Sequence, residues 1–240
     1  MTFVSRNSIL STLEPAVVLR AGGQIQRAEC RRGEVLQEIG ATVQWVWFPE
    51  DSLISVASEA VSGESVAGGL IGWNGAYGAF EACGSRNSFT RAVVQIAGAA
   101  CKIRADHYRE LFDHSAALRT SIHRHIEALL VEQRQLVACA ALHTVESRLC
   151  RVLLEASERS HGGNVLQLTQ EALAQILGVQ RTTIAVTAST LQKAKLIKTA
   201  RGAVELLDLN GLEAAACACR ATIMYASDEI YSSRAKVCGD

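Results

Sequence analysis

Basic side chains gather in one part of a chain that is neutral overall. Between Gln180 and Arg201 the sequence has no acidic residue, and its basic residues are Arg181, Lys193, Lys195, Lys198 and Arg201. The whole chain has 24 Lys and Arg against 24 Asp and Glu, so this is a local concentration of charge. Such a patch suits phosphate groups, because their neutralisation supplies most of the non-specific affinity for nucleic acid.

Residues 168–191 predict the elements that would position this charge: two short helices joined by a tight turn, the pattern of a helix-turn-helix. Thr169 is a good N-cap, because its hydroxyl can accept a hydrogen bond from an orphan backbone N–H. Gly178 can end the first helix in the left-handed conformation. An ordinary helical hairpin is the alternative interpretation. The apolar residues expected to face inward are Leu173, Ile176, Leu177, Ile184 and Leu191.

Two strand-like segments follow, at residues 195–199 and 203–207, with a turn between them. A helix-turn-helix followed by a small hairpin is a winged one, and its second helix would enter the major groove of double-stranded DNA. The residues predicted to contact DNA are Thr169, Gln170, Gln180, Arg181, Thr182, Thr183, Val186, Ser189, Lys198 and Arg201.

The first half of the chain has a different texture. Between about residues 24 and 103, short segments rich in β-branched and aromatic residues alternate with turn residues, which predicts an antiparallel β-roll. Glycines crowd residues 63–84, where they could form the corners of the roll or let backbone approach a ligand. Residues 20–105 contain no histidine, so a metal-dependent roll enzyme is not expected and the chain is predicted not to be an enzyme.

A long helix is predicted between these two halves. Its seam alternates at intervals of four and three residues, while a separate face carries Leu130 and Val137. One stripe can pack on the roll while the other meets a second copy; a helix packed wholly inside one subunit is the alternative. His123 and His125 point to different helix faces and are expected to be solvated or interfacial. The predicted dimer-interface residues are Ile122, Ile126, Leu129, Gln133, Leu136 and Ala140.

Composition excludes several other classes of protein. The apolar content of 49% allows real cores, and the absence of a signal peptide or a membrane-length apolar run predicts a cytoplasmic protein without a membrane partner. The eight cysteines are scattered and are expected to be reduced, buried thiols. Cys217 and Cys219 with Cys238 fit no common metal site, so neither a metal nor a cofactor is expected. Residues 1–20 are predicted to be helical, and the chain is expected to fray beyond Ser227.

The order of roll, long helix and winged helix-turn-helix resembles the Crp/Fnr superfamily of bacterial transcription regulators. The strongest likeness lies in residues 168–174, LTQEALA, with Gly178 and Arg181-Thr182-Thr183. Arg32-Gly33-Glu34, Phe48-Pro49 and Gly75-Ala76-Tyr77-Gly78 support it in the first half. The resemblance implies an α+β fold, with a cyclic-nucleotide-binding-like sensor roll at residues 1–112, a dimerisation helix at 113–145 and a winged DNA-binding domain with a tail at 146–240.

The resemblance further implies a homodimer on a palindromic operator, with RNA polymerase as a further candidate partner. A small-ligand sensor whose winged domain contacts protein rather than DNA is the alternative. Thr182 and Val186 stand where members reading the best-known palindrome have Glu and Arg, so a different operator is expected.

The effector of such a sensor is not identified by the sequence. Members that bind cyclic AMP have a Gly-Glu pair in the glycine-rich cassette, whereas Ala76 follows Gly75 here, so binding of cyclic AMP is not expected. Only Cys30 lies in the first 80 residues, which excludes an N-terminal iron–sulfur cluster. The candidate effector-pocket residues are Gly75, Tyr77, Gly78, Arg86 and Arg91.

Overall fold

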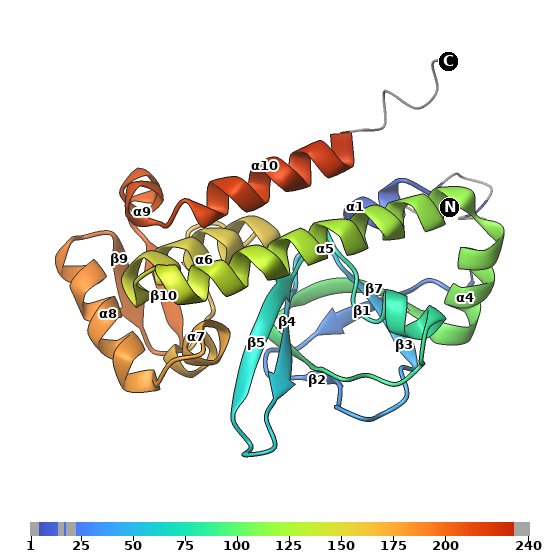
Figure 1. The fold of residues 1–240 in the computed structure, drawn as a ribbon, viewed down its shortest axis with the longest axis horizontal. Coiled ribbons are helices and arrows are strands. Elements are labelled where there is room, and N and C mark those ends of the chain that lie inside the picture. Colours follow the sequence, from blue (N-terminus) through green and yellow to red (C-terminus); the bar gives the residue numbers. More distant parts are fainter. Residues whose placement is uncertain (1–4, 14–16, 18–22, 233–240) are drawn as a thin grey trace.

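Antiparallel strand pairing builds the N-terminal half of the protein, seen here in a computed structural model that describes residues 5–13, 17 and 23–232 (Figure 1). Two sheets form the roll, with strand orders β1-β7-β3 and β2-β6-β4-β5. The strands are β1 (Gln26–Cys30), β2 (Val35–Gln37), β3 (Trp45–Pro49), β4 (Leu53–Glu59), β5 (Ser65–Ile71), β6 (Arg91–Ile96) and β7 (Gly98–Arg104). The short β-branched segments of the sequence therefore pair as expected.

The two faces of the β1-β7-β3 sheet bury different side chains because successive residues of a strand point to opposite faces. Trp47 packs inside the roll with Ile54 and Val94, while its neighbour Phe48 faces the helices and meets Tyr108. The helices of this half are α1 (Ser8–Ser11), α3 (Ala79–Cys83), α4 (Ala105–His114) and α5 (Ala116–Leu142).

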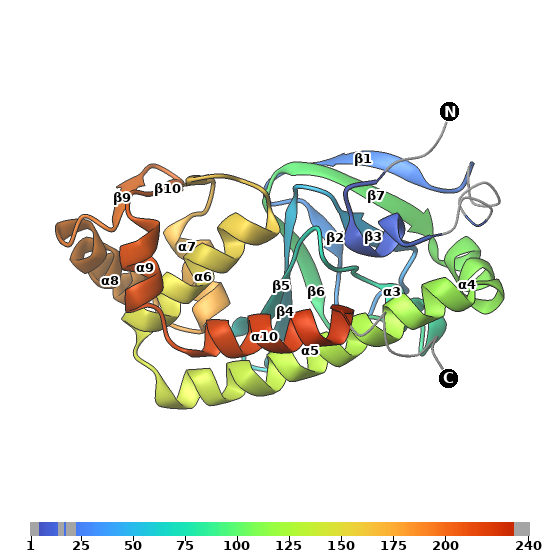
Figure 2. The same ribbon diagram turned by 90° about the horizontal axis from the view of Figure 1, so that it is seen from above.

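Helix α5 runs along most of the length of the molecule and joins its two halves (Figures 1 and 2). It begins at Ser115, whose Oγ accepts a hydrogen bond from the Leu118 amide at 3.1 Å. It ends at His143, and Thr144 then caps the next helix by accepting from the Ser147 amide. The two helices are thus separated by a short joint at residues 143–144.

The C-terminal half is a winged helical domain whose sheet has the order β8-β10-β9. Its core includes Leu153, Leu173 and Ile184, and it is continuous with Leu53 and Leu70 of the roll. Its elements are α6 (Val145–Arg159), β8 (Val165–Leu166), α7 (Gln170–Leu177), α8 (Arg181–Lys193), β9 (Ile197–Ala200), β10 (Ala203–Leu206), α9 (Leu209–Ala215) and α10 (Cys219–Ser232).

Both ends of the described chain differ from expectation. Of the residues 1–20 predicted to be helical, Ser8–Ser11 form α1, whereas residues 5–7 and 12–13 are not helical, and residues 1–4, 14–16 and 18–20 lie outside the described residues. The prediction that the chain frays beyond Ser227 is wrong as far as Ser232, because α10 continues to that residue and lies beside α5 (Figure 2). Buried Ile223 and a 3.4 Å contact between the Tyr231 hydroxyl and His125 Nδ1 hold α10 there. No helix among the described residues is long and apolar enough to cross a membrane.

Candidate nucleic-acid interface

Helices α7 and α8 form the helix-turn-helix that the sequence predicted. The Thr169 hydroxyl accepts from the Ala172 amide at 3.0 Å and so caps α7. Gly178 has φ of 64° and ends α7 in the left-handed conformation. Ala174 is buried, and this small residue leaves room for Ile184 and Leu191, which point from α8 into the core. Local spacing therefore fixes both the turn and the inner face of α8.

The opposite face of α8 is exposed. Because Ile184 and Leu191 pack one face of α8 into the core, the polar side chains of the opposite face remain accessible to a partner. Val186 is an apolar exception with 70% of its surface accessible, a feature expected of a residue that meets a thymine methyl group. Thr169, Gln170 and Thr183 are half-buried at the base of this surface. The predicted DNA contacts that are exposed are Gln180, Arg181, Thr182, Val186, Ser189, Lys198 and Arg201.

The wing is the antiparallel pair β9 and β10, which places Lys198 opposite Glu205. Their side chains form an exposed ion pair at 3.6 Å, so part of the Lys198 charge is neutralised within the wing. Arg201 lies in the exposed turn between the two strands. We therefore expect Arg201 to be the stronger phosphate ligand of the two.

The helix-turn-helix and the wing both rest on the roll, a feature that the sequence did not predict. Gln175 of α7 donates to Ser65 Oγ at 2.8 Å, and Val66 of β5 lies against Gly178 in the turn. Arg32 of the roll donates to the carbonyl oxygen of Gly202 in the wing at 3.0 Å. The position of the reading surface is thus coupled directly to the roll.

The glycine cassette of the roll is closed by α5. His125 is fully buried, its Nε2 accepts from the Ala76 amide at 3.1 Å, and a Cβ atom placed on Gly75 would come within 2.9 Å of its ring. Burial lowers the pKa of His125 to about 4, so its ring is neutral at pH 7. The expectation that His125 is solvated or interfacial is wrong, because the missing side chain of Gly75 opens a space that the imidazole fills.

The residues predicted to form an effector pocket lie in different environments. The Tyr77 hydroxyl is buried against Ser88 Oγ at 2.8 Å. Arg91 forms a surface ion pair with Glu38 at 2.9 Å, and Arg86 is exposed in a turn with φ of 67°. Arg91 thus has an acidic partner on the outer surface, and the effector pocket stays a prediction.

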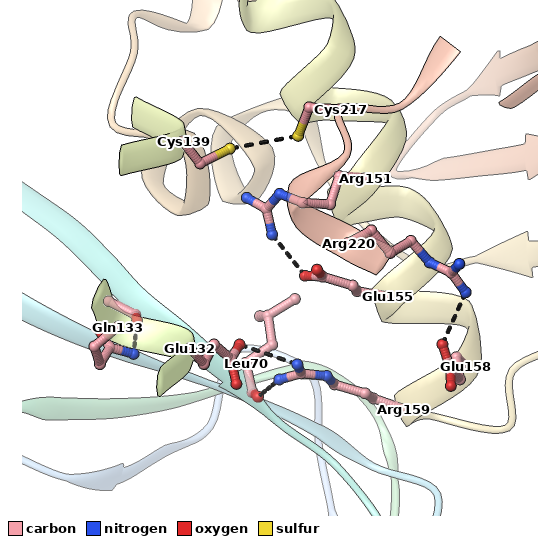
Figure 3. A network of polar contacts seen from close by, with 11 residues as sticks. Leu70, Glu132, Gln133, Cys139, Arg151, Glu155, Glu158, Arg159, Cys217 and Arg220 are labelled. Carbon is pink, nitrogen blue, oxygen red and sulfur yellow. Dashed lines mark hydrogen bonds and ion pairs between the residues drawn. The ribbon is translucent and has the colours of Figure 1, made fainter. Parts of the chain in front are cut away.

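A buried network of ion pairs connects the roll, α5 and α6 (Figure 3). Arg159 of α6 lies 3.0 Å from Glu132 of α5 and donates to the carbonyl oxygen of Leu70 in β5. Two turns before Arg159 on α6, Arg151 pairs with Glu155 at 2.7 Å. Burial raises the pKa of Glu132, and the Arg159 guanidinium opposes that rise. Because both partners are buried, loss of either leaves an uncompensated charge inside the protein.

The predicted dimer seam on α5 divides between two environments. Ile122 is buried in the core beneath the roll, and Ile126 packs against that core, so this part of the seam is used inside the chain. Gln133 donates to the Gly68 carbonyl oxygen of β5. The separate face is the one left open, with Leu130 52% and Val137 73% accessible.

Four side chains of the kinds that bind metal ions lie close together, although no metal site was expected from the sequence. Cys217 and Cys219 lie beside Cys139 and His143, which stand at the C-terminal end of α5. The four residues were missed because they come from segments 78 positions apart in the sequence. Cys238, the third residue considered from the sequence, lies outside the described residues.

The described chain combines a β-roll, a long helix and a winged helix-turn-helix whose second helix has an exposed face. Residues 147–215 match the Crp-like helix-turn-helix domain family. No curated protein sequence matches the chain.

Several solved structures share the fold over most of the chain. FixK2 from Bradyrhizobium japonicum superposes with a TM-score of 0.68 at 12% identity, covering 80% of this chain and 98% of its own. The c-di-GMP responsive global regulator CLP of Xanthomonas campestris gives 0.65 at 16% identity, covering 81% and 100%. A CRP/FNR family transcriptional regulator from Thermus thermophilus gives 0.64 at 20% identity, covering 80% and 98%. The winged domain thus matches the Crp-like helix-turn-helix family, and the chain shares the fold of these Crp/Fnr structures, as the resemblance implied.

Proposed function

We propose that the protein is a sequence-specific DNA-binding transcription regulator that acts as a homodimer on a palindromic operator. The observation that carries the proposal is the exposed face of α8, where Arg181 and Thr182 stand beside the basic wing. Arg181 at the first turn of α8 is suited to a bidentate contact with guanine. In this proposal residues 1–112 sense, 113–145 dimerise and 146–240 bind DNA in the cytoplasm, where RNA polymerase is a candidate partner.

The open face of α5 supports the dimer. The exposed residues Leu130, Gln133, Val137 and Ala140 recur at intervals of three and four residues, the spacing of a coiled-coil seam. Leu130 and Val137 are the exposed apolar residues at the centre of this seam. A second copy of α5 would remove both from water and would place two copies of α8 on either side of a two-fold axis.

The proposed effector is not cyclic AMP. His125 packs against Gly75 of the glycine cassette, Arg91 is paired with Glu38, and Arg86 is exposed. A buried cyclic phosphate without an arginine partner would lack a charge-assisted contact of roughly 1.5–3 kcal/mol. An effector of other chemistry would act by shifting the balance between arrangements of the winged domains.

A pair of matched variants tests the reading surface. We expect Arg181→Ala to cost about 1–3 kcal/mol on the preferred duplex and to relax base preference at one position of each half-site. Arg201→Ala should weaken all duplexes evenly and lower the salt-dependence slope by about one. Fluorescence anisotropy across a salt series and a panel of single-base changes gives both readouts.

Two outcomes would count against the proposal. An equal loss of affinity for every sequence in the Arg181→Ala variant would remove its base-reading role. Absence of salt-sensitive DNA binding by the unmodified protein at low ionic strength would favour a winged domain that contacts protein.

A further inference from the structure

Four side chains of metal-binding type meet where α5, α6 and α10 adjoin. Cys139 lies in the last turn of α5, His143 follows that helix, Cys217 precedes α10, and Cys219 begins it. One ligand atom from each residue lies within 4.8 Å of all the others. Cys139 Sγ is 3.5 Å from Cys217 Sγ, a contact drawn as a dashed line in Figure 3, and Cys219 Sγ is 3.4 Å from His143 Nδ1.

These distances fit a tetrahedral metal ion. Zinc bonds to sulfur and nitrogen are about 2.3 Å and 2.0–2.1 Å long, so neighbouring ligand atoms in a tetrahedron lie about 3.5–3.8 Å apart. The sulfur–sulfur and sulfur–nitrogen distances here are close to that range. A disulfide would instead require the two sulfur atoms to approach to about 2.05 Å. A set of three thiols and one imidazole is one of the common structural zinc sites.

The polar surroundings separate this cluster from ordinary buried cysteines. Cys139, Cys217 and Cys219 form a small buried group of their own, distinct from the three apolar cores. Gln135 turns its amide toward them and donates to Cys219 Sγ at 3.1 Å. Such a donor is typical of the second layer around a metal-bound thiolate. By contrast, Cys150 is buried in the apolar core of the winged domain.

A buried arginine lies beside the cluster and can balance the charge of a bound ion and its ligands. One divalent ion with three thiolates and a neutral imidazole has a net charge of −1, and the buried Arg151 guanidinium is the neighbouring cation that lowers the pKa of Cys139. Arg151 Nε is buried and has no hydrogen-bond partner among the described residues. Thiols bind a metal ion as thiolates, so binding at neutral pH releases their protons to solvent.

We propose that Cys139, His143, Cys217 and Cys219 bind one Zn²⁺ ion in tetrahedral geometry. No electron transfer is involved, because the ion exchanges only with the protons of the three thiols. The site ties the end of the long helix to the segment between α9 and α10, and the Cys217 amide already donates to the Ser147 carbonyl oxygen of α6 at 3.3 Å.

The position of the site gives it a structural consequence. His143 lies in the joint between α5 and α6, directly before the Thr144 cap. A bound ion therefore fixes the angle between the long helix and the winged domain. On the proposed function, this angle sets the separation of the two recognition helices; the metal site itself does not depend on DNA binding.

Metal content of the full-length protein tests the proposal without DNA. We expect protein purified in reducing buffer to bind one Zn²⁺ per chain by elemental analysis. Replacement by Co²⁺ should give the visible bands of a tetrahedral ion and the near-ultraviolet bands of thiolate ligands. Cys217→Ser and His143→Ala should each weaken metal binding at least about tenfold, whereas Cys150→Ser, a matched buried thiol outside the cluster, should retain it.

Thiol protection keeps the proposal testable if a variant does not fold. In the unmodified protein Zn²⁺ should slow alkylation of Cys139, Cys217 and Cys219, and should leave alkylation of exposed Cys83 unchanged. The proposal is overturned if the reduced protein takes up no stoichiometric Zn²⁺, if Co²⁺ gives an octahedral spectrum, or if Cys150→Ser loses the metal equally. Failure of DNA binding with full metal content would instead count against the proposed function alone.

Discussion

The helix-turn-helix and the glycine cassette are both marked by residue spacing, but they have opposite environments in the structure. The outer face of α8 is open to solvent, and its conformation follows from residues within one or two helical turns. The cassette is closed by His125, which lies 49 positions away in the sequence. A motif that depends on local caps and turns can thus be predicted from its own residues. A motif whose use depends on a distant partner cannot.

Breaking a contact between distant segments should change the free energy of unfolding most. Arg159→Ala leaves Glu132 buried without its partner and removes a hydrogen bond to the Leu70 carbonyl oxygen. We expect unfolding free energy to fall by about 3–5 kcal/mol in chemical denaturation. Arg91→Ala is the matched control, because it breaks an exposed ion pair and should cost less than about 1 kcal/mol. Similar losses in the two variants would mean that the buried network does not join the halves.

The closed cassette predicts a loss of stability in mild acid. An unfolded histidine has a pKa near 6.5, while burial holds the pKa of His125 at about 4. Above about pH 7 both states are neutral, and as the pH falls the unfolded state takes up the proton first. Stability should therefore fall from about pH 6.5 towards pH 4, by about 3 kcal/mol in total.

The variant His125→Gln isolates this contribution. Other groups near the ring, Arg159 and Tyr231 among them, are present in both proteins and contribute equally. Denaturation at a series of pH values should show a shallower acid slope for the variant. An unchanged slope would mean that His125 is accessible to protons in the folded protein.

Close backbone contact between the roll and α6 predicts a smaller effect. A Cβ atom on Gly72 would overlap the backbone of Arg159, whereas one on Gly23 meets nothing within 4 Å. We expect Gly72→Ala to cost about 1–3 kcal/mol, and Gly23→Ala to be near neutral by thermal unfolding. The Trp73 indole, which donates to the Glu158 carbonyl oxygen at 3.0 Å, offers a fluorescence probe of the same contact. Equal melting temperatures for the two variants would contradict the close approach.

Loss of a local helix cap should change the free energy of unfolding least. Thr169→Ala removes the hydroxyl that caps α7 and should cost about 1 kcal/mol. Thr190→Ala on the exposed face of α8 is the control, because its hydroxyl bonds only to the preceding turn at 3.3 Å. If Thr169→Ala changed stability more than Arg159→Ala, the division between local and long-range determinants would be wrong.

The fold and the exposed face of α8 could be predicted because both follow from periodicity and turn residues. The spacing of Leu173, Gly178 and Ile184 specifies the helix-turn-helix, and its core residues are buried as expected. The contacts of His125 and the meeting of Cys139 with Cys217 could not be predicted. Each depends on how two distant segments pack, and neither segment has a pattern that points to the other.

Selection of bound duplexes from a random library, using purified reduced protein with nothing added, tests the central claim most directly. We predict recovery of a palindrome whose half-sites are centred about 34 Å apart, as two copies of α8 related by a two-fold axis require. Recovery of no preferred sequence, either alone or with cell extract to supply an effector, would contradict a dimeric DNA reader.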